Sequence, residues 1–360
     1  MLDRYNAIRR AAREVTVGRV KIGGKHPIAV QSMTNTDTLD VGATLRQVQA
    51  LEAAGCDVVR ITAPSVEAAK TFAAIKEAGV HIPLVADIHF DYRTALECAA
   101  AGVDKIRINP GNIGDELRVR AVADACRAKN IPIRIGVNGG SLEKEILAKY
   151  GAPTAEALAE SALYHASLLE KYDFCDIVLS VKSSDPLAMV GANKILAGAC
   201  DYPIHIGVTE AGGGNAGLVK GAVGIGGSLL LGIGDTVRVS LTENPPEEVR
   251  AARDILSALD IDARPRLSIV ACPTCGRTKI DLIPLVKAFE AAAQEANMMD
   301  KPLKVALMGC AVNGPGEARE ADIGIAGGVH EALLFKKGEI VEKIREDDII
   351  PRLIAEIQQM

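Results

Sequence analysis

Short runs rich in β-branched residues alternate with alanine-rich segments of helical periodicity through about the first 260 of the chain's 360 residues. The eight runs that we interpret as strands are residues 28–32, 57–62, 83–89, 105–109, 133–138, 177–182, 204–209 and 236–240. A helix is predicted after each of them, and the last helix covers residues 246–259. Eight successive strand–helix units predict a (β/α)8 barrel, the TIM barrel, with a doubly wound open sheet as the alternative.

The pattern changes at residues 260–265, which carry two Asp and a Pro. We therefore predict a domain boundary there, with a substrate-binding barrel domain at residues 1–262 and a second domain at residues 263–360. The elements expected in the second domain are strands at 267–271, 303–308 and 323–326, helices at 283–296 and after 347, and a hairpin at 332–342. These elements predict a small α+β domain.

Composition and charge exclude several classes of protein. The 41 basic and 46 acidic residues give a net charge of −5, no basic run is long enough to grip a nucleic-acid backbone, and the chain has no Trp for base stacking. The most apolar segment, residues 221–234, is interrupted by glycines and too short to span a membrane, so it indicates a buried helix. The N-terminus has no apolar segment typical of a signal peptide, so we expect a cytoplasmic location.

Five predicted strands each carry a cation near the C-terminal end, on the face shared by residues two apart. In (β/α)8 barrels this end of the strands lines the active site. Any single cation could equally point outward or pair with a carboxylate, but five converging cations would repel one another unless an anion joined them. We therefore expect a phosphate or diphosphate ligand. The cations are Arg60, Arg107, Arg134, Lys182 and Arg238, and the polar residues at the same strand ends are Asp87, Asn109, Asn138, Thr209, Glu210 and Ser240.

The second domain contains three cysteines in two turns. Cys272 and Cys275 lie in a CPTC run directly after a predicted strand, and Cys310 lies in an MGCAVNGPGE run. The only histidine nearby is His330, so no ordinary zinc quartet is complete. Three thiolates in glycine-containing turns suit a [4Fe–4S] cluster whose fourth iron is open to substrate or bound by oxygen. Glu317 is the nearest oxygen ligand, although a plain helix-start glutamate is an equally good interpretation of it.

Eight cysteines in a reducing compartment favour metal or redox chemistry at some positions over disulfides. The five cysteines of the barrel domain share no spacing and are expected to be structural. They are Cys56, Cys98, Cys126, Cys175 and Cys200.

The runs AVQSMTNT at residues 29–36, CPTCGRT at 272–278 and MGCAVNGPGEA at 308–318 together resemble the 4-hydroxy-3-methylbut-2-en-1-yl diphosphate synthase family in its bacterial two-domain form. The resemblance covers nearly the whole chain. It implies an oxidoreductase of non-mevalonate isoprenoid biosynthesis that reductively opens 2-C-methyl-D-erythritol 2,4-cyclodiphosphate, with loss of water, to give 4-hydroxy-3-methylbut-2-enyl diphosphate. The implied electron donor is flavodoxin or ferredoxin.

The resemblance also assigns roles to individual residues. It implies a [4Fe–4S] cluster bound by Cys272, Cys275, Cys310 and Glu317, and Glu210 is a candidate for the proton donor. The residues that it places around the substrate are Arg60, Asp87, Arg107, Asn109, Arg134, Asn138, Lys182, Thr209, Arg238 and Ser240.

Two other functions stay open from the sequence. A barrel with basic residues at its active-site end also resembles pterin-binding synthases, which transfer groups without redox chemistry. That function would leave the cysteine domain unexplained. An iron–sulfur electron carrier fused to a barrel would leave the five cations without a ligand.

The topology further predicts a homodimer with cross-chain active sites. The helix at residues 246–259 returns the chain to the bottom of the barrel, whereas the substrate is expected at the top. A connector of about six residues spans at most about 20 Å, too little for a second domain to reach its own barrel top. A two-fold pair instead brings each cluster to the other chain's barrel.

Overall fold

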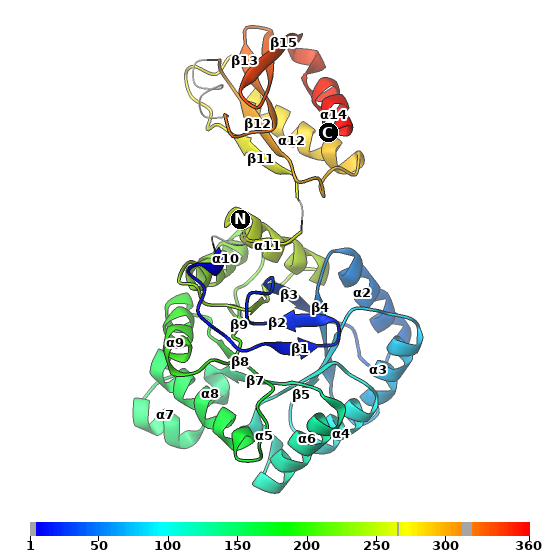
Figure 1. Cartoon of the computed structure of the whole chain (residues 1–360), viewed down its shortest axis with the longest axis vertical. Helices are drawn as coiled ribbons and strands as arrows, with labels where there is room; N and C mark the ends of the chain where they lie inside the picture. The colour runs from blue at the N-terminus through cyan, green and yellow to red at the C-terminus, as the bar shows by residue number, and fades with distance from the viewer. Residues whose placement is uncertain (1–4, 265, 312–318) are drawn as a thin grey trace. The chain divides into compact units, whose positions relative to one another are not determined.

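The computed structural model describes residues 5–264, 266–311 and 319–360. The chain forms two compact units, Met1–Ala263 and Arg264–Met360, drawn in blue to yellow-green and in yellow to red in Figure 1. Each unit has a separate hydrophobic core. The roles of the two units, substrate binding and cluster binding, stay predictions at this point.

The first unit is the predicted (β/α)8 barrel, which the strand order confirms. Eight parallel strands follow the order β8-β7-β6-β5-β4-β3-β10-β9, and a bridge between Leu179 and Ile204 joins the two ends of this sheet. Figure 1 shows the strands enclosed by a ring of helices. The strands are β3 (Ala29–Met33), β4 (Val58–Ala63), β5 (Leu84–Ile88), β6 (Lys105–Ile108), β7 (Ile133–Asn138), β8 (Ile177–Lys182), β9 (His205–Ile206) and β10 (Thr236–Val237).

The helices around the barrel begin where side-chain caps are available. Asp40, Asp91, Asp115, Thr154 and Asp185 each accept a hydrogen bond from a backbone N–H in the first helical turn, which stabilises a helix by about 1 kcal/mol. The helices are α2 (Val41–Ala53), α3 (Ala68–Glu77), α4 (Tyr92–Ala100), α5 (Pro110–Ile113), α6 (Glu116–Lys129), α7 (Lys144–Tyr150), α8 (Ala155–Glu170), α9 (Pro186–Ala199), α10 (Gly214–Leu230) and α11 (Pro245–Ala258). The short helices α5 and α7 were not predicted from the sequence.

A hairpin that the sequence analysis missed closes the barrel at the end where the strands begin. Strands β1 (Val15–Val17) and β2 (Val20–Ile22) pair antiparallel. Val17 and Ile22 pack against Ala29, Val58 and Val85, which lie at or near the starts of β3, β4 and β5. The end where the strands finish is therefore the one left for a ligand.

The chain leaves the barrel at this same closed end. On α11, the Arg253 guanidinium donates to the Gly55 carbonyl oxygen at 2.7 Å and forms ion pairs with Asp57 at 2.6 Å and Asp262 at 2.9 Å. Gly55 and Asp57 lie just before β4. Asp262, the next-to-last residue of the first unit, is thus anchored where the strands begin.

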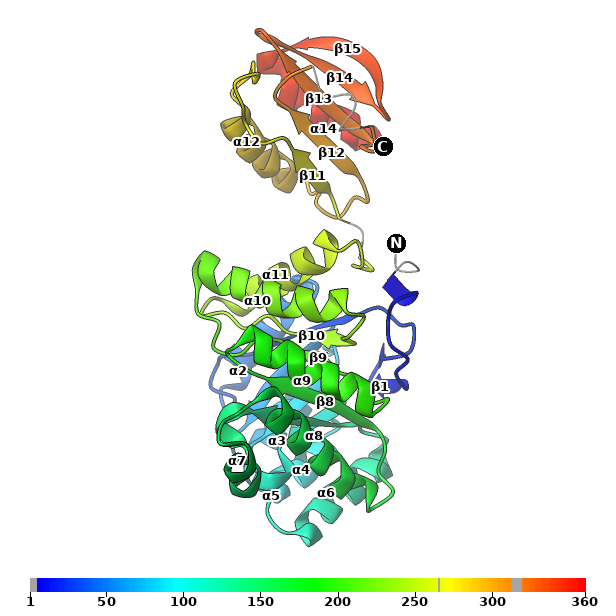
Figure 2. The same ribbon diagram turned by 90° about the vertical axis from the view of Figure 1, so that its left-hand side faces the viewer.

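Helix α10 differs from the expected buried helix. Its inner face is buried and includes Gly224, where a Cβ atom would lie 2.5 Å from Val208. Its outer face, however, leaves Val219 and Val223 each 60% exposed and Leu230 66% exposed. Figure 2 shows α9 and α10 side by side on the outside of the barrel. Within the described residues, no helix combines the length and the apolar character needed to cross a membrane.

The second unit is an α+β structure around one mixed sheet, ordered β11-β12-β13-β14-β15. Its first three strands are parallel, and the last two add an antiparallel hairpin. Helices α12 and α14 pack against each other and contribute Phe289, Leu353 and Ile357 to the core. The elements are β11 (Ser268–Ala271), α12 (Leu282–Glu295), β12 (Lys304–Met308), β13 (Ile323–Gly328), β14 (Glu331–Lys336), β15 (Glu339–Arg345) and α14 (Ile349–Gln359).

Candidate active site

The five predicted cations converge on one cavity at the end of the barrel where the strands finish. The cavity has a volume of about 60 Å³ and a polar lining. Eight of the ten predicted substrate-site residues line it, namely Arg60, Arg107, Arg134, Asn138, Lys182, Thr209, Arg238 and Ser240. The period of two along a strand brings these side chains together, because each strand turns the same face inward.

Asp87 lies among the cations and holds two of them. The carboxylate is fully buried and pairs with Arg60 at 3.0 Å and with Arg107 at 3.1 Å. Burial raises the pKa of Asp87, but Arg60 and Arg107 outweigh this effect and lower that pKa to about 2. Asp87 is therefore a permanent anion that orients two arginines, and it is not among the residues that line the cavity.

Glu248 is a site residue that the sequence analysis missed. This carboxylate of α11 accepts two hydrogen bonds from the Arg238 guanidinium, both at 3.2 Å. It also accepts one from the Ser32 hydroxyl at 2.8 Å. The sequence feature that could have revealed Glu248 is the helical period. It places Glu248 on the same buried face of α11 as Ala252 and Ile255.

Arg134 differs from these paired arginines. It is 1% exposed, and its Nε and Nη1 atoms have no hydrogen-bond partner within the described part of the chain. Burial lowers the pKa of both Arg134 and Lys182, and the nearby cations lower each further. Unpaired buried cations are costly, so an anionic ligand would stabilise this cavity.

Besides Asp87, two predicted residues lie near the cavity without lining it. Asn109 follows β6 and is 3% exposed. Glu210 follows Thr209 in the loop after β9, is exposed, and has a positive φ of 52°. The predicted role of Glu210 as proton donor stays a prediction.

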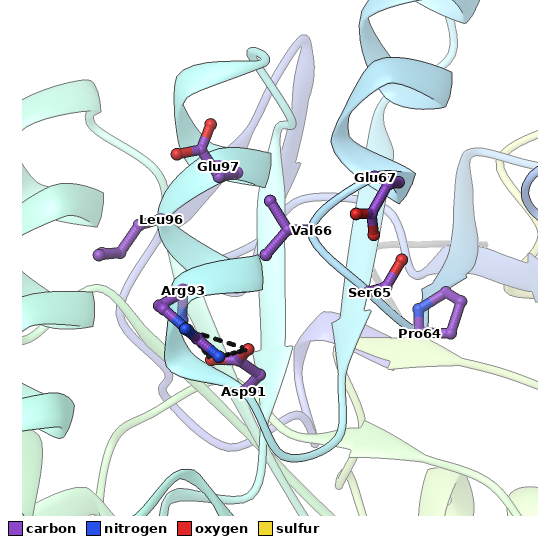
Figure 3. A pocket seen from close by; sticks show the side chains of 8 residues that line it. All are labelled: Pro64, Ser65, Val66, Glu67, Asp91, Arg93, Leu96 and Glu97. Atoms are coloured by element: carbon purple, nitrogen blue, oxygen red, sulfur yellow. Dashed lines mark hydrogen bonds and ion pairs between the residues drawn. The ribbon is translucent and has the colours of Figure 1, made fainter.

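A larger pocket of about 540 Å³ lies beside the starts of α3 and α4 (Figure 3). Its only cation, Arg93, is paired with Asp91 at 2.9 Å, and Glu67 and Glu97 add negative charge. An anion would be repelled from this pocket, and none of the predicted site residues lines it.

The three cysteines of the second unit lie at two neighbouring turns. Cys272 follows β11 and Cys310 follows soon after β12, and these parallel strands pair directly. The Gly309 N–H donates to the Cys272 sulfur at 3.2 Å. The Lys279 N–H donates to the Gly309 carbonyl at 2.8 Å, which ties the turn after Cys275 to the turn before Cys310. A Cβ atom on Gly309 would lie 2.8 Å from the Thr278 side chain, so this approach requires glycine.

This donor set fits an iron–sulfur cluster. Thiolates are the ligands of such clusters, and backbone N–H bonds to sulfur, like the one from Gly309, stabilise them. Within the described residues, no three Cys, His, Asp or Glu side chains already surround one point as metal ligands would. Glu317, the predicted fourth ligand, lies outside the described residues.

Three of the five barrel cysteines have the properties of structural residues. Cys56, Cys98 and Cys126 are buried, and burial raises the pKa of each thiol to about 12. Cys200 is half-buried and Cys175 is exposed.

Comparisons with known proteins assign both units to the same protein family. Residues 12–253 match the family described as the GcpE TIM-barrel domain, and residues 268–359 match the GcpE protein C-terminal domain. The chain is 54% identical, over 98% of both chains, to 4-hydroxy-3-methylbut-2-en-1-yl diphosphate synthase (flavodoxin) of Ruminiclostridium cellulolyticum. It is also 54% identical, over 96% of both chains, to the protein of the same name from Fusobacterium nucleatum.

A solved structure shows similarity in fold alone. The type I 3-dehydroquinate dehydratase of Clostridium difficile matches 69% of this chain and 98% of its own, with a TM-score of 0.51 and 14% identity.

The barrel cavity and the cysteine unit define an iron–sulfur oxidoreductase built on a (β/α)8 barrel. The chain belongs to the 4-hydroxy-3-methylbut-2-en-1-yl diphosphate synthase family, in its bacterial two-domain form. The resemblance, the enzyme class and the [4Fe–4S] cofactor predicted from the sequence are thereby confirmed.

Proposed function

We propose that this chain opens the ring of 2-C-methyl-D-erythritol 2,4-cyclodiphosphate by reduction and dehydration, and so forms 4-hydroxy-3-methylbut-2-enyl diphosphate. The observation that carries this proposal is the cavity whose wall holds five cations, at the strand ends where barrel enzymes bind substrate. The relatives' names give flavodoxin as the electron donor, which we extend to this chain, with ferredoxin as the alternative. We also propose a cytoplasmic location, which the free state of all eight cysteines supports.

The residues of the barrel would bind and orient the diphosphate. Guanidinium groups grip phosphate oxygens with two parallel hydrogen bonds, whereas the Lys182 ammonium acts as a point charge. Asp87 and Glu248 hold Arg60, Arg107 and Arg238 in place before the ligand arrives, which reduces the side-chain entropy lost on binding. Arg134, which has no carboxylate partner among the described residues, would gain most from the ligand's charge.

The cysteine unit would hold the redox group. A [4Fe–4S] cluster bound by Cys272, Cys275 and Cys310 supplies the electrons for the reduction when it is present. The Gly309 N–H would stabilise the negative charge on the Cys272 sulfur. Glu210, exposed after β9, would deliver a proton to the leaving oxygen.

An anaerobic turnover assay tests the proposed function. The full-length protein with its cluster should convert the cyclodiphosphate to the linear diphosphate with reduced flavodoxin, as followed by ³¹P NMR and mass spectrometry. The variant Cys272→Ser should abolish conversion because it removes a cluster ligand, while Cys98→Ser, in the barrel, should leave the cluster and the turnover in place. Electron transfer without ring opening would instead support the electron-carrier function, and a transfer reaction without reductant would support the pterin-type function.

We further propose that Glu317 is the fourth, replaceable cluster ligand. A carboxylate binds cluster iron more weakly than a thiolate, so a substrate oxygen could displace it. We expect Glu317→Cys to keep the cluster, with greater resistance to oxygen, and to lose most turnover. Glu320→Cys, three residues away on an exposed side chain, is the matched control and should turn over normally.

Spectroscopy tests the ligation directly. We expect Mössbauer and electron paramagnetic resonance spectra of the parent protein to show the signature of a unique iron, and those of Glu317→Cys to lose it. Parent-like spectra, or parent-like turnover, in Glu317→Cys would assign Glu317 a structural role in its turn instead.

We also propose a homodimer in which each second unit completes the partner's barrel. Two observations on the first unit support it. Asp262 is anchored where the barrel strands begin, so the chain leaves at the end opposite the cation-lined cavity. The exposed apolar side chains of α10, Val219, Val223 and Leu230, form a surface of the kind that oligomers bury.

A further inference from the structure

Lys105, on β6, is a buried cation without an assigned role. It is fully buried, and it shares the inward face of β6 with Arg107, because the two residues are two apart in one strand. Its Nζ atom has no hydrogen-bond partner within the described residues. It does not line the cavity that the proposed diphosphate would occupy. A buried ammonium in this setting is costly unless a charge of opposite sign is near.

The charged and titratable groups of the barrel interior come from every neighbouring strand. Asp87 is opposite Arg107 in the strand register, two residues along from Val85, which is the register partner of Lys105. Asp87 already pairs with Arg60 and Arg107. His205, on β9, is fully buried, and burial together with the surrounding cations lowers its pKa well below the ordinary value, so its ring is neutral. These groups include Arg60 on β4, Asp87 on β5 with His89 beside it, Arg107 on β6, Arg134 on β7, Lys182 on β8, His205 on β9, and Arg238 after β10 with its partner Glu248 on α11.

We propose that Lys105 is a proton-accepting counter-charge for the diphosphate: a neutral amine when the cavity holds no anion, and an ammonium when an anion is bound. Burial first, and then Arg134 and Arg60, lower the pKa of Lys105 well below its ordinary value. An anion held by these same arginines cancels their repulsion, so the pKa of Lys105 rises on binding. The proton comes from solvent and stays on Nζ, and no bond to the ligand forms or breaks.

The proposed reaction gives the protonation of Lys105 a function. In the cyclic substrate each phosphorus carries one ester bond and the shared anhydride bridge, and therefore one negative charge, whereas breaking one carbon–oxygen bond on ring opening frees a terminal phosphate that carries one more negative charge. The ammonium that forms beneath the arginines when the substrate binds would then also offset the further negative charge created in the reaction. Any charge effect of Lys182 cannot be distinguished from direct contact with the ligand, because Lys182 lines the cavity. Lys105 does not line the cavity, so it acts on the ligand only through its electrostatic field. Lys105 is therefore a positioning residue, and its role rests on the proposed function of the cavity.

Calorimetric titration of the full-length, cluster-loaded protein with inorganic pyrophosphate tests the proposal. Titrations near pH 7.5 in buffers of different ionisation enthalpy give the number of protons taken up on binding. We expect the parent protein to take up about one proton more than Lys105→Met does. We also expect pyrophosphate affinity to fall more steeply with rising pH in the parent than in the variant, because the bound state holds the extra proton. Lys129→Met, at an exposed lysine of α6, is the matched control and should behave like the parent.

A second variant, Lys105→Gln, keeps the test valid if Lys105→Met fails to fold. Both variants should show the same reduced proton uptake. Equal proton uptake in the parent and in either folded Lys105 variant would overturn the proposal. Failure of the parent protein to bind pyrophosphate at all would contradict the proposed role of the cavity, and would remove the basis for this inference with it. Binding that is retained in both variants with reduced proton uptake supports Lys105 as the counter-charge.

Discussion

Replacing Arg134 by Met will make the enzyme slower and the ligand-free protein more stable. Arg134 is 1% exposed, and two of its nitrogen atoms have no partner in the described residues, so its burial without an anion is unfavourable. Replacing such a buried charge by an apolar side chain of similar length raises the free energy of unfolding by about 1–4 kcal/mol. The same change removes a charge-assisted grip on the diphosphate and weakens transition-state binding by about 2–4 kcal/mol, a loss of about 30- to 1,000-fold in kcat/KM.

Thermal unfolding with and without pyrophosphate, together with steady-state kinetics, checks both parts of this prediction. Pyrophosphate should raise the Tm of the parent protein and should raise that of Arg134→Met much less. Arg250→Met is the matched control, because Arg250 is an exposed arginine of α11 that pairs with Glu247. Parent-like kinetics in Arg134→Met would show that the cavity does not bind the reacting diphosphate.

Mixing two inactive variants should restore activity if the active sites are shared between chains. Cys310→Ser damages the cluster ligands, and Arg134→Ala damages the barrel cavity. In a mixed dimer with cross-chain sites, one site combines both defects and the other combines an intact barrel with an intact second unit. Random exchange makes half of the dimers mixed, so activity should rise to about a quarter of the parent's.

The control for this experiment is a mixture of Cys310→Ser and Cys272→Ser. Both changes lie in the second unit, so every site in every dimer keeps a damaged cluster and the mixture should stay inactive. Native mass spectrometry must show that mixed dimers form. Mixed dimers of Cys310→Ser and Arg134→Ala that remain inactive would mean that each barrel works with the second unit of its own chain.

Several parts of the site could be predicted from local sequence. The alternation of side chains along a strand placed Arg60, Arg107 and Arg134 on inward faces, and the barrel topology then placed them at one end. The spacing of Cys272 and Cys275 after a strand indicated a ligand turn. Such features depend on a few neighbouring residues and on the regular geometry of strands, so they can be predicted from a single sequence.

Other parts depended on tertiary contacts that the local pattern does not show. The ion pair of Arg238 with Glu248 joins the end of a strand to the following helix, and the β1–β2 hairpin closes a barrel formed by residues far from it in the chain. The expectation of a buried helix at residues 221–234 was correct for only one face of α10, for a related reason. Apolar composition does not say which face of α10 another element covers, and Val223 and Leu230 remain exposed.

The sequence by itself determined the fold class, the number of barrel strands, the inward-facing cations and the cysteine turns, because periodicity and spacing are local properties of the chain. Only the tertiary structure decided which cations have partners: Arg60 and Arg107 share Asp87, Arg238 has Glu248, and the buried Lys105 has none among the described residues. The physical reason is that the energy of a buried charge depends on what surrounds it in three dimensions. Burial and neighbouring charge are properties of the packed barrel and not of any segment of its sequence.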